Sequence, residues 1–197
     1  MMQTNLDAEA VFNAILQRRS MGLSRLKDDA VPRELIEQML EAANWAPSHG
    51  DTEPWRFTVF MGEGRAALAQ IFGRAMKEPE SARKRAFAAP VWISIGMAPA
   101  RRADGSLKMS VEEELMAVAC AVQNLHLMAH ALGLTGMWHS KGPSVDLAVA
   151  GGLGLDAPDR LLGFFMCGWP AGEWLSSERG PLAEKVRWVE EAADFNG

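Results

Sequence analysis

Cysteine is scarce in this chain: only Cys120 and Cys167 occur among its 197 residues, and each lies inside an apolar segment. Disulfide frameworks belong mainly to small secreted domains with many cysteines. We therefore expect two buried thiols in a reducing compartment. The first ten residues are polar and acidic, and they lack the basic stretch followed by an apolar run that marks a secretory signal. Both absences favour a cytoplasmic protein.

Long apolar runs and long runs of one charge are missing as well. No stretch of about 18 uncharged apolar residues occurs, so we expect no membrane-spanning helix. The 20 Lys and Arg residues are outnumbered by 25 Asp and Glu residues, and the net charge is −5. Basic residues cluster only briefly, at 83–85 and 101–102, where a solvated surface is the simplest interpretation. A nucleic-acid partner is therefore not expected, because such proteins present an extended basic footprint.

The residues that are present favour one α+β domain. Apolar residues make up 48% of the chain and charged residues 23%, which suffices for a single domain, 1–197, with a substantial core. Helices are expected over 7–19, 31–46, 65–77, 81–87, 110–132 and 144–150, and strands over 55–61, 91–97, 136–139 and 161–167. Because the strands do not alternate strictly with helices, the sequence predicts an interior sheet covered by helices. Residues from about 172 to 197 are expected to form a C-terminal arm.

The expected helix over 110–132 carries the first candidate for a metal site. It opens with a capping box of Ser110 and Glu113, and it is apolar nearly all round, which indicates burial by its own domain or by a second subunit. His126 and His130 stand one helical turn apart on it, a spacing found in metal sites. No third ligand is obvious. Histidines packed in a helical interface are the favoured interpretation, and we predict no metal.

A second candidate motif is the segment 62–67, Gly-Glu-Gly-Arg-Ala-Ala, which lies between an expected strand and an expected helix. It matches one form of the dinucleotide-binding fingerprint. Glu63, however, would place an anion near a pyrophosphate, and the preceding strand carries Arg56 and Thr58 where a doubly buried run is typical. A plain turn between strand and helix is the favoured interpretation. No Ser-His-Asp arrangement is indicated either, so no catalytic side chain is predicted.

Arg18, Arg19 and Ser20 close the first expected helix. Two guanidinium groups and a hydroxyl offer many donors and two permanent positive charges, which suit a phosphate monoester or a polyhydroxy chain. Cationic residues in the last turn of a helix also complement the helix macrodipole. The residues alone leave both interpretations open.

Several segments taken in order resemble a known family. They are Arg18-Arg19-Ser20, Ala46-Pro47-Ser48-His49, Pro54-Trp55-Arg56-Phe57, the helix end Ala131-Leu132-Gly133-Leu134, Gly136-Met137-Trp138-His139-Ser140, and Gly163-Phe164-Phe165 with Gly168. Each motif is weak alone, but together they resemble the nitroreductase family over residues 7–170. The likeness is closest to its small FMN-dependent branch, the NAD(P)H nitroreductases of the YdjA type.

The resemblance implies an interlocked homodimer of α+β subunits that holds one FMN at each of two sites on the subunit interface. It also implies roles for eight cofactor-binding residues. Arg18, Arg19 and Ser20 would hold the ribityl phosphate end and the pyrimidine side of the flavin. Pro47 would line the ring pocket and His49 would reach the cofactor of the opposite subunit. Trp138, His139 and Ser140 would follow the flavin from the other side.

For the reaction, the resemblance implies ping-pong transfer of hydride. NAD(P)H would deliver hydride to flavin N5, and an electron-poor acceptor, a nitro compound or a quinone, would then take the electrons. Two alternatives stay open: an FMN-binding protein without turnover, and a relative that acts on another substrate. A largely helical scaffold, in which the arginine pair only ends a helix, is a third.

Four positions depart from the family pattern. Asp51 and Glu53 stand where many members carry Asn and Gln near the flavin ring, and a carboxylate there would repel the reduced anionic flavin. His139 and Trp45 replace arginines that are usual in the YdjA-type branch. These differences bear on the flavin potential and the choice of electron donor more than on FMN binding itself.

Overall fold

The computed structural model describes residues 7–191 and has an α+β fold built on a four-stranded antiparallel sheet. The strands are β1 (Trp55–Met61), β2 (Val91–Met97), β3 (Thr135–His139) and β4 (Arg160–Gly168), in the spatial order β1-β2-β4-β3. The sequence predicted all four strands. Every pairing between them is antiparallel, so the turn Gly62–Gly64 that follows β1 belongs to no parallel βαβ unit and is a plain entry into the next helix.

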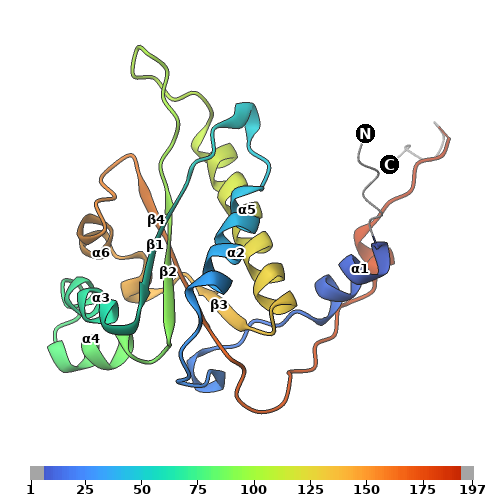
Figure 1. Ribbon diagram of the computed structural model, residues 1–197. Helices are drawn as coiled ribbons and strands as arrows, with labels where there is room; N and C mark the ends of the chain where they lie inside the picture. Colours follow the sequence, from blue (N-terminus) through green and yellow to red (C-terminus); the bar gives the residue numbers. More distant parts are fainter. Residues whose placement is uncertain (1–6, 192–197) are drawn as a thin grey trace.

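Helices cover both faces of the sheet (Figure 1). The first face carries α2 (Arg33–Asn44) and α5 (Val111–Ala131), and the second carries α3 (Arg65–Phe72), α4 (Pro79–Ala86) and α6 (Leu147–Gly152). The helix predicted over 65–77 is shorter than expected, because Gly73 closes it and turns follow. Helix α4 begins earlier than predicted, since Pro79 fits the first turn, where a missing N–H costs little. The capping box of Ser110 and Glu113 opens α5 as predicted.

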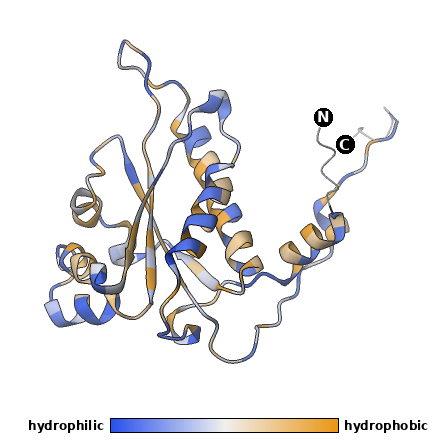
Figure 2. Ribbon diagram, viewed as in Figure 1, coloured by the Kyte–Doolittle hydropathy of each residue, from blue (hydrophilic) through white to orange (hydrophobic). Residues whose placement is uncertain are grey.

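Helix α1 (Ala8–Gln17) lies beyond the end of α5 and away from the sheet, and the segment near the C-terminus runs beside it (Figure 1). None of its residues is buried, although hydrophobic residues line it (Figure 2). Four of them, Val11, Phe12, Ile15 and Leu16, are 49–61% exposed. The indole of Trp174 donates to the carbonyl of Gln17 over 2.7 Å and ties the two segments together. An exposed row of apolar side chains of this kind is typical of an interaction surface.

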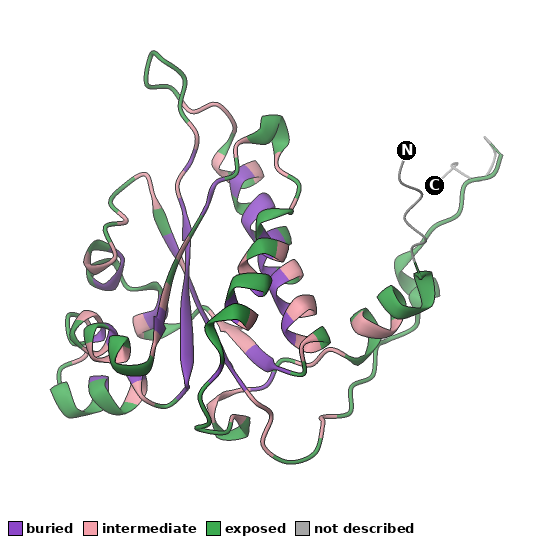
Figure 3. Cartoon of the chain, in the orientation of Figure 1, coloured by how far each residue is buried: buried purple, intermediate pink, exposed green. Residues whose placement is uncertain are grey.

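Strand β2 is the centre of the core and is buried along its whole length (Figure 3). Its side chains alternate between two clusters, because successive side chains of a strand point to opposite faces. Ile93 and Ile95 face α2 and α5. Trp92 faces α3 and α4, where it meets the rings of Phe72 and Phe164 edge-on at 5.6 and 6.0 Å between centroids. The helices thus cover both faces of the sheet, and one side of α5 stays exposed to the solvent (Figure 3).

The cysteine prediction is half right. Cys167 is buried in β4, and burial raises the pKa of its thiol to about 12. Cys120 lies exposed on α5, so the expectation of two buried thiols is wrong for this residue; both are free. Over residues 7–191, no helix combines the length and the apolar character needed to cross a bilayer.

Candidate functional site

The segment after α1 lies against the edge strand β3. Helix α1 ends at Gln17 because Arg18 adopts an extended conformation (φ −54, ψ 135). Ser20 then bridges to Gly136, and the amide of Met21 donates to the carbonyl of Gly136 over 3.0 Å. This contact brings together two of the motifs that resemble the family, the one that ends at Ser20 and the one that contains Trp138. These two residues are 118 positions apart in the sequence.

This contact depends on the glycine. A Cβ atom at Gly136 would lie 2.2 Å from the carbonyl oxygen of Met166 and 2.7 Å from the ring of Phe165. Both are within the body of the sheet and cannot move away cheaply. Only glycine therefore lets β3 approach β4 closely enough here while its other edge receives Ser20.

A cavity of about 290 Å³ opens where Ser20, β3 and α5 meet; we call it the arginine pocket. It is lined by Arg18, Ser20, Ala119, Val122, Gln123, His126 and Trp138. The Arg18 guanidinium donates to Ser20 Oγ over 3.3 Å, whereas its Nε is buried and has no hydrogen-bond partner among the described residues. The Trp138 indole donates to the carbonyl of Leu162 over 2.9 Å, which fixes the ring as a wall of the pocket. The pocket therefore presents a rigid aromatic wall and an unsatisfied cationic donor.

His126 forms the polar part of the α5 side of this pocket. It is 8% exposed and meets the ring of Phe165 edge-on at 4.5 Å. Burial first, and then the charge of Arg18, lower the pKa of His126 to about 4, so its ring is neutral near pH 7. The neighbouring His130 also has a lowered pKa, from burial and the charges of Arg18 and Arg19. Within the described part of the chain, no three His, Cys, Asp or Glu side chains are grouped closely enough to hold a metal ion.

Arg19 points away from the arginine pocket. Its Nε donates to the carbonyl of Leu175 over 2.7 Å, and its NH1 group donates to the carbonyls of Leu16 and Arg18 at 2.7 and 2.9 Å. The second arginine of the pair therefore fastens the C-terminal segment to the end of α1. The structure brings Arg18 and Ser20, but not the Arg19 side chain, to the pocket.

Trp138 and His139 lie on opposite faces of the sheet, because successive side chains of a strand alternate. The ring of His139 lies on the α4 side, where its Nδ1 is 3.3 Å from a terminal nitrogen of Arg85 and 3.0 Å from Ser144 Oγ. Burial, followed by the charges of Arg85 and Lys141, lowers the pKa of His139. Arginine can only donate, so His139 Nδ1 accepts from it. Ser140 follows the strand and is exposed.

Arg85 is a residue that the sequence interpretation missed. The cluster at 83–85 was expected to be solvated, which is wrong for Arg85: its guanidinium is half buried, over the rings of Phe72 at 5.3 Å and Trp92 at 5.7 Å. The helical spacing of Arg85 from the buried Ala82 is the signal that could have placed it on the inner side of α4.

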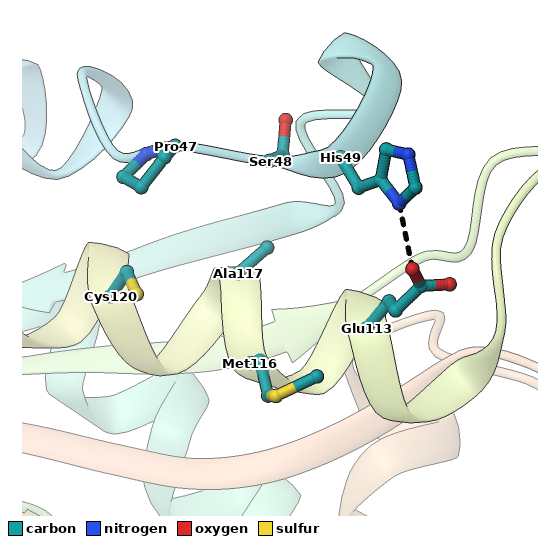
Figure 4. A pocket seen from close by; sticks show the side chains of 7 residues that line it. All are labelled: Pro47, Ser48, His49, Glu113, Met116, Ala117 and Cys120. Atoms are coloured by element: carbon teal, nitrogen blue, oxygen red, sulfur yellow. Dashed lines mark hydrogen bonds and ion pairs between the residues drawn. The ribbon is translucent and has the colours of Figure 1, made fainter. Parts of the chain in front are cut away.

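A second depression, which we call the histidine groove, lies at the other end of α5 (Figure 4). It has a volume of about 420 Å³ and is lined by Pro47, Ser48, His49, Glu113, Met116, Ala117 and Cys120. His49 Nδ1 lies 2.7 Å from Glu113 Oε1. The bond to His49, followed by bonds from Ser110, lowers the pKa of the Glu113 carboxyl. The sequence pointed to Pro47 and His49 here, but it gave Glu113 only the role of a helix cap.

The loop that carries His49 is held in an unusual conformation. Gly50, Asp51 and Glu53 have φ values of +62, +52 and +43, and the last two are uncommon for residues with a side chain. The Thr52 hydroxyl donates to Glu114 Oε2 over 2.6 Å, and Glu114, only 1% exposed, also accepts from the amide of Ala100 over 3.1 Å. This buried carboxylate, which the sequence analysis did not single out, fastens the loop above α5.

The family-specific departures have definite places. Asp51 and Glu53 are both exposed on the loop described above. Trp45 is 80% exposed at the end of α2, where its indole donates to Glu41 over 2.9 Å. It lines an apolar depression between α1, α2 and α5 and belongs to neither the arginine pocket nor the histidine groove.

Comparison with known proteins gives a consistent result. A family model described as the nitroreductase family matches residues 15–169. The Escherichia coli (strain K12) protein YdjA, provisionally named an NAD(P)H nitroreductase, is 29% identical over 163 residues, which cover 79% of this chain and 86% of that protein. A nitroreductase-like family protein from Bacillus cereus superposes with a TM-score of 0.77 at 28% identity, covering 97% of this chain and 100% of that chain.

A further similar structure contains a flavin. It is a provisionally identified nitroreductase from Desulfovibrio desulfuricans in complex with FMN, 31% identical, with a TM-score of 0.68 and coverage of 92% of this chain and 96% of that chain. The family match covers most of the chain, and the sequence motifs that resemble the family all lie within this one fold. The chain belongs to the nitroreductase family.

Proposed function

We propose that the protein is an FMN-dependent oxidoreductase that passes hydride from NAD(P)H to an electron-poor acceptor, a nitro compound or a quinone, in a ping-pong cycle. When bound, FMN supplies a hydride acceptor and donor at its N5 atom. The observation that supports this proposal most is the buried Nε of Arg18, which has no hydrogen-bond partner among the described residues, at the arginine pocket of a chain similar to a protein crystallised with FMN.

The side chains of the arginine pocket fit this cofactor. The buried Nε of Arg18 needs an acceptor, and a phosphate group would satisfy it with charge-assisted hydrogen bonds. Ser20 and Gln123 add a hydroxyl and an amide for the ribityl chain or the pyrimidine edge. The ring of His126 is neutral near pH 7, so Arg18 supplies the positive charge of the pocket lining. The pocket thus combines one cation with neutral donors.

The other predicted residues would act around this pocket. Arg19 would support it by holding Leu175 and the end of α1. His139 and Ser140 would help to position the end of β3 beside Trp138. The His139 side chain itself does not reach the pocket, because it is bonded to Arg85 and Ser144.

The exposed side of α5 supports a homodimer in which the two depressions meet. Residues 113, 116, 117 and 120 line the histidine groove, and residues 119, 122, 123 and 126 line the arginine pocket. If two copies of α5 pack antiparallel about an axis between Ala119 and Cys120, Met116 faces the partner's Gln123 and Glu113 faces the partner's His126. Each α5 residue that lines the histidine groove of one copy would then face an α5 residue that lines the arginine pocket of the other copy.

This register follows from twofold symmetry, because in such an interface a contact between two positions occurs twice. Small side chains at the crossing point, Ala119 and Cys120, let two helices approach closely. Each site would then be built from the arginine pocket of one subunit and the histidine groove of the other. Pro47 and His49 would thereby reach the cofactor of the opposite subunit.

The spectrum of the purified protein tests the proposal directly. We expect the protein loaded with FMN to be yellow, to lose its flavin absorbance anaerobically when NADH or NADPH is added, and to regain it when a quinone or nitroarene follows. A protein that retains no FMN would contradict the proposal. A yellow protein that neither nicotinamide reduces would instead identify an FMN-binding protein without this turnover.

A further inference from the structure

The pair formed by His49 and Glu113 has a defined proton arrangement. Glu113 Oε2 accepts from the backbone amide and the hydroxyl of Ser110, each over 3.1 Å, while Oε1 is 2.7 Å from His49 Nδ1. An ionised carboxylate can only accept hydrogen bonds, and the lowered pKa of Glu113 keeps it ionised. His49 Nδ1 is therefore the donor in this bond and carries a hydrogen, which leaves Nε2 as the ring nitrogen that can exchange a proton with a bound molecule.

The surroundings of this pair suit a reacting molecule better than a structural contact. The His49 ring stands over α5 at one end of the histidine groove, and the floor of the groove is formed by Met116, Ala117 and Cys120 (Figure 4). The imidazole side chain is 66% exposed, so its bond to Glu113 is not needed to satisfy a buried group. His49 lies at the end of the groove away from Cys120 (Figure 4), where two crossing copies of α5 would diverge, so an aromatic acceptor can lie beside the oriented imidazole.

We infer that His49, oriented by Glu113, is the catalytic acid that donates a proton to an oxygen of the acceptor during its reduction. This inference rests on the proposed function, because the acceptor would stack on the flavin held by the partner subunit. Reduction of the acceptor consumes a hydride and a proton, and His49 would supply this proton.

The step is balanced for a quinone. The quinone takes a hydride, two electrons and one proton, from the reduced flavin, and this leaves negative charge on an oxygen. That oxygen forms an O–H bond with the proton of His49 Nε2 as the Nε2–H bond breaks, which gives the hydroquinone and oxidised flavin. His49 is left neutral, with its remaining hydrogen on Nδ1 and still donated to Glu113, and the solvent returns a proton to Nε2. A nitro group follows the same count: hydride plus one proton gives a nitroso group and water.

Four charged groups lie around His49. Glu113 comes from α5, and Lys108, whose ammonium donates to the carbonyl of Gly50, comes from the loop after β2. Asp51 and Glu53 belong to the same loop as His49. Among these, Glu113 is the group in direct contact with the imidazole, so the tautomer of the ring depends on Glu113.

Nuclear magnetic resonance of the ring nitrogens tests the orientation without any turnover. In the 15N-labelled full chain with a neutral His49 ring, we expect the Nδ1–H tautomer, and we expect Glu113→Ala to shift the ring toward the Nε2–H tautomer that free imidazole side chains prefer. Ser110→Ala is the matched control, because it also weakens the helix cap but leaves the bond between His49 and Glu113 in place. The Nε2–H tautomer in the unaltered protein would overturn the inference.

The chemical role is tested with two acceptors in anaerobic single-turnover experiments on enzyme reduced beforehand. Benzoquinone needs a proton and ferricyanide does not, so the ratio of their rates isolates the protonation step. We expect His49→Gln, which can still donate to Glu113, to lower this ratio by about 100-fold or more, within the range found for general acids. We also expect the benzoquinone rate of the unaltered enzyme to fall as pH rises, and this dependence to be lost in the variant.

The outcomes separate this inference from the proposed function. A protein that binds no FMN contradicts the proposed function, while the tautomer measurement still decides whether the pair is arranged as described. A protein that binds and reduces FMN, but whose ratio of benzoquinone to ferricyanide rates is the same in His49→Gln, contradicts only the role of His49.

Discussion

Replacing Arg18 by methionine is the sharpest test of the arginine pocket. Arg18 makes one hydrogen bond to Ser20, no ion pair within residues 7–191, and leaves its Nε buried without a partner. Burial, followed by the charges of Arg179 and Arg19, lowers the pKa of Arg18. The free subunit therefore gains little from this guanidinium, whereas a phosphate group would gain much. Arg18→Met should weaken FMN binding without destabilising the folded chain.

The expected size of the effect follows from the bonds that are lost. Two charge-assisted hydrogen bonds to a phosphate contribute about 1.5–3 kcal/mol each. The side chain is only partly buried, so we take the lower end, about 3 kcal/mol in total, which corresponds to about a 100-fold increase in Kd. With FMN at 100 times the original Kd, the stabilisation by the ligand should fall from about 2.7 to about 0.4 kcal/mol.

The assay combines FMN fluorescence titration with the thermal midpoint measured with and without FMN. Arg33→Ala is a suitable control, since it removes another guanidinium, which pairs with Glu37 on the exposed side of α2. We expect this control to bind FMN as the unaltered chain does. A Kd for Arg18→Met within threefold of the original, or an equal loss of thermal stability without FMN, would refute the reasoning.

Three further predictions follow from the same structure. Cys120 lies next to the proposed twofold axis, so mild oxidation should join two subunits by a disulfide between their Cys120 residues, and Cys120→Ala, which leaves only the buried Cys167, should abolish the product on a non-reducing denaturing gel. Gly136→Ala should destabilise the fold by about 3 kcal/mol in urea unfolding, because its Cβ would meet a carbonyl oxygen at 2.2 Å, whereas Gly64→Ala, with nothing within 4 Å, should not. His126 has its pKa lowered from 6.5 to about 4 in the folded state, so the unfolded chain binds the extra proton and the unfolding free energy should fall by about 3 kcal/mol between pH 6.5 and 4. His126→Gln should remove this part of the pH dependence, and equal pH profiles for both proteins would contradict it.

Short-range patterns carried the prediction of the fold. Alternation and apolar content placed the four strands, and the capping box with a closing glycine placed α5, because these signals depend on neighbouring residues. The order of the strands depends on pairings between distant segments, and no periodicity encodes them. The convergence of Ser20 with Gly136 was available only through the family resemblance.

The candidate site shows the limits more clearly. A strand turns adjacent side chains to opposite faces, so Trp138 and His139 could not both face one pocket, and this could have been predicted from the sequence. The position of the Arg19 side chain could not, since it depends on the carbonyl of Leu175 far along the chain. Glu114 was equally hidden, because an acidic residue in the first turn of a helix is usually a solvated partner of the macrodipole, whereas here it is buried beneath Thr52.

The bond between Gln17 and Trp174 has a consequence for biosynthesis, since it joins positions 157 residues apart. Translation at about 5–20 residues per second would put about 8–30 s between the appearance of these two positions at the ribosome. During that interval the hydrophobic side of α1 lacks the C-terminal segment that later lies beside the helix (Figure 1), and it is open to chaperones. The N-terminal helix is made first, yet it reaches its native contacts among the last.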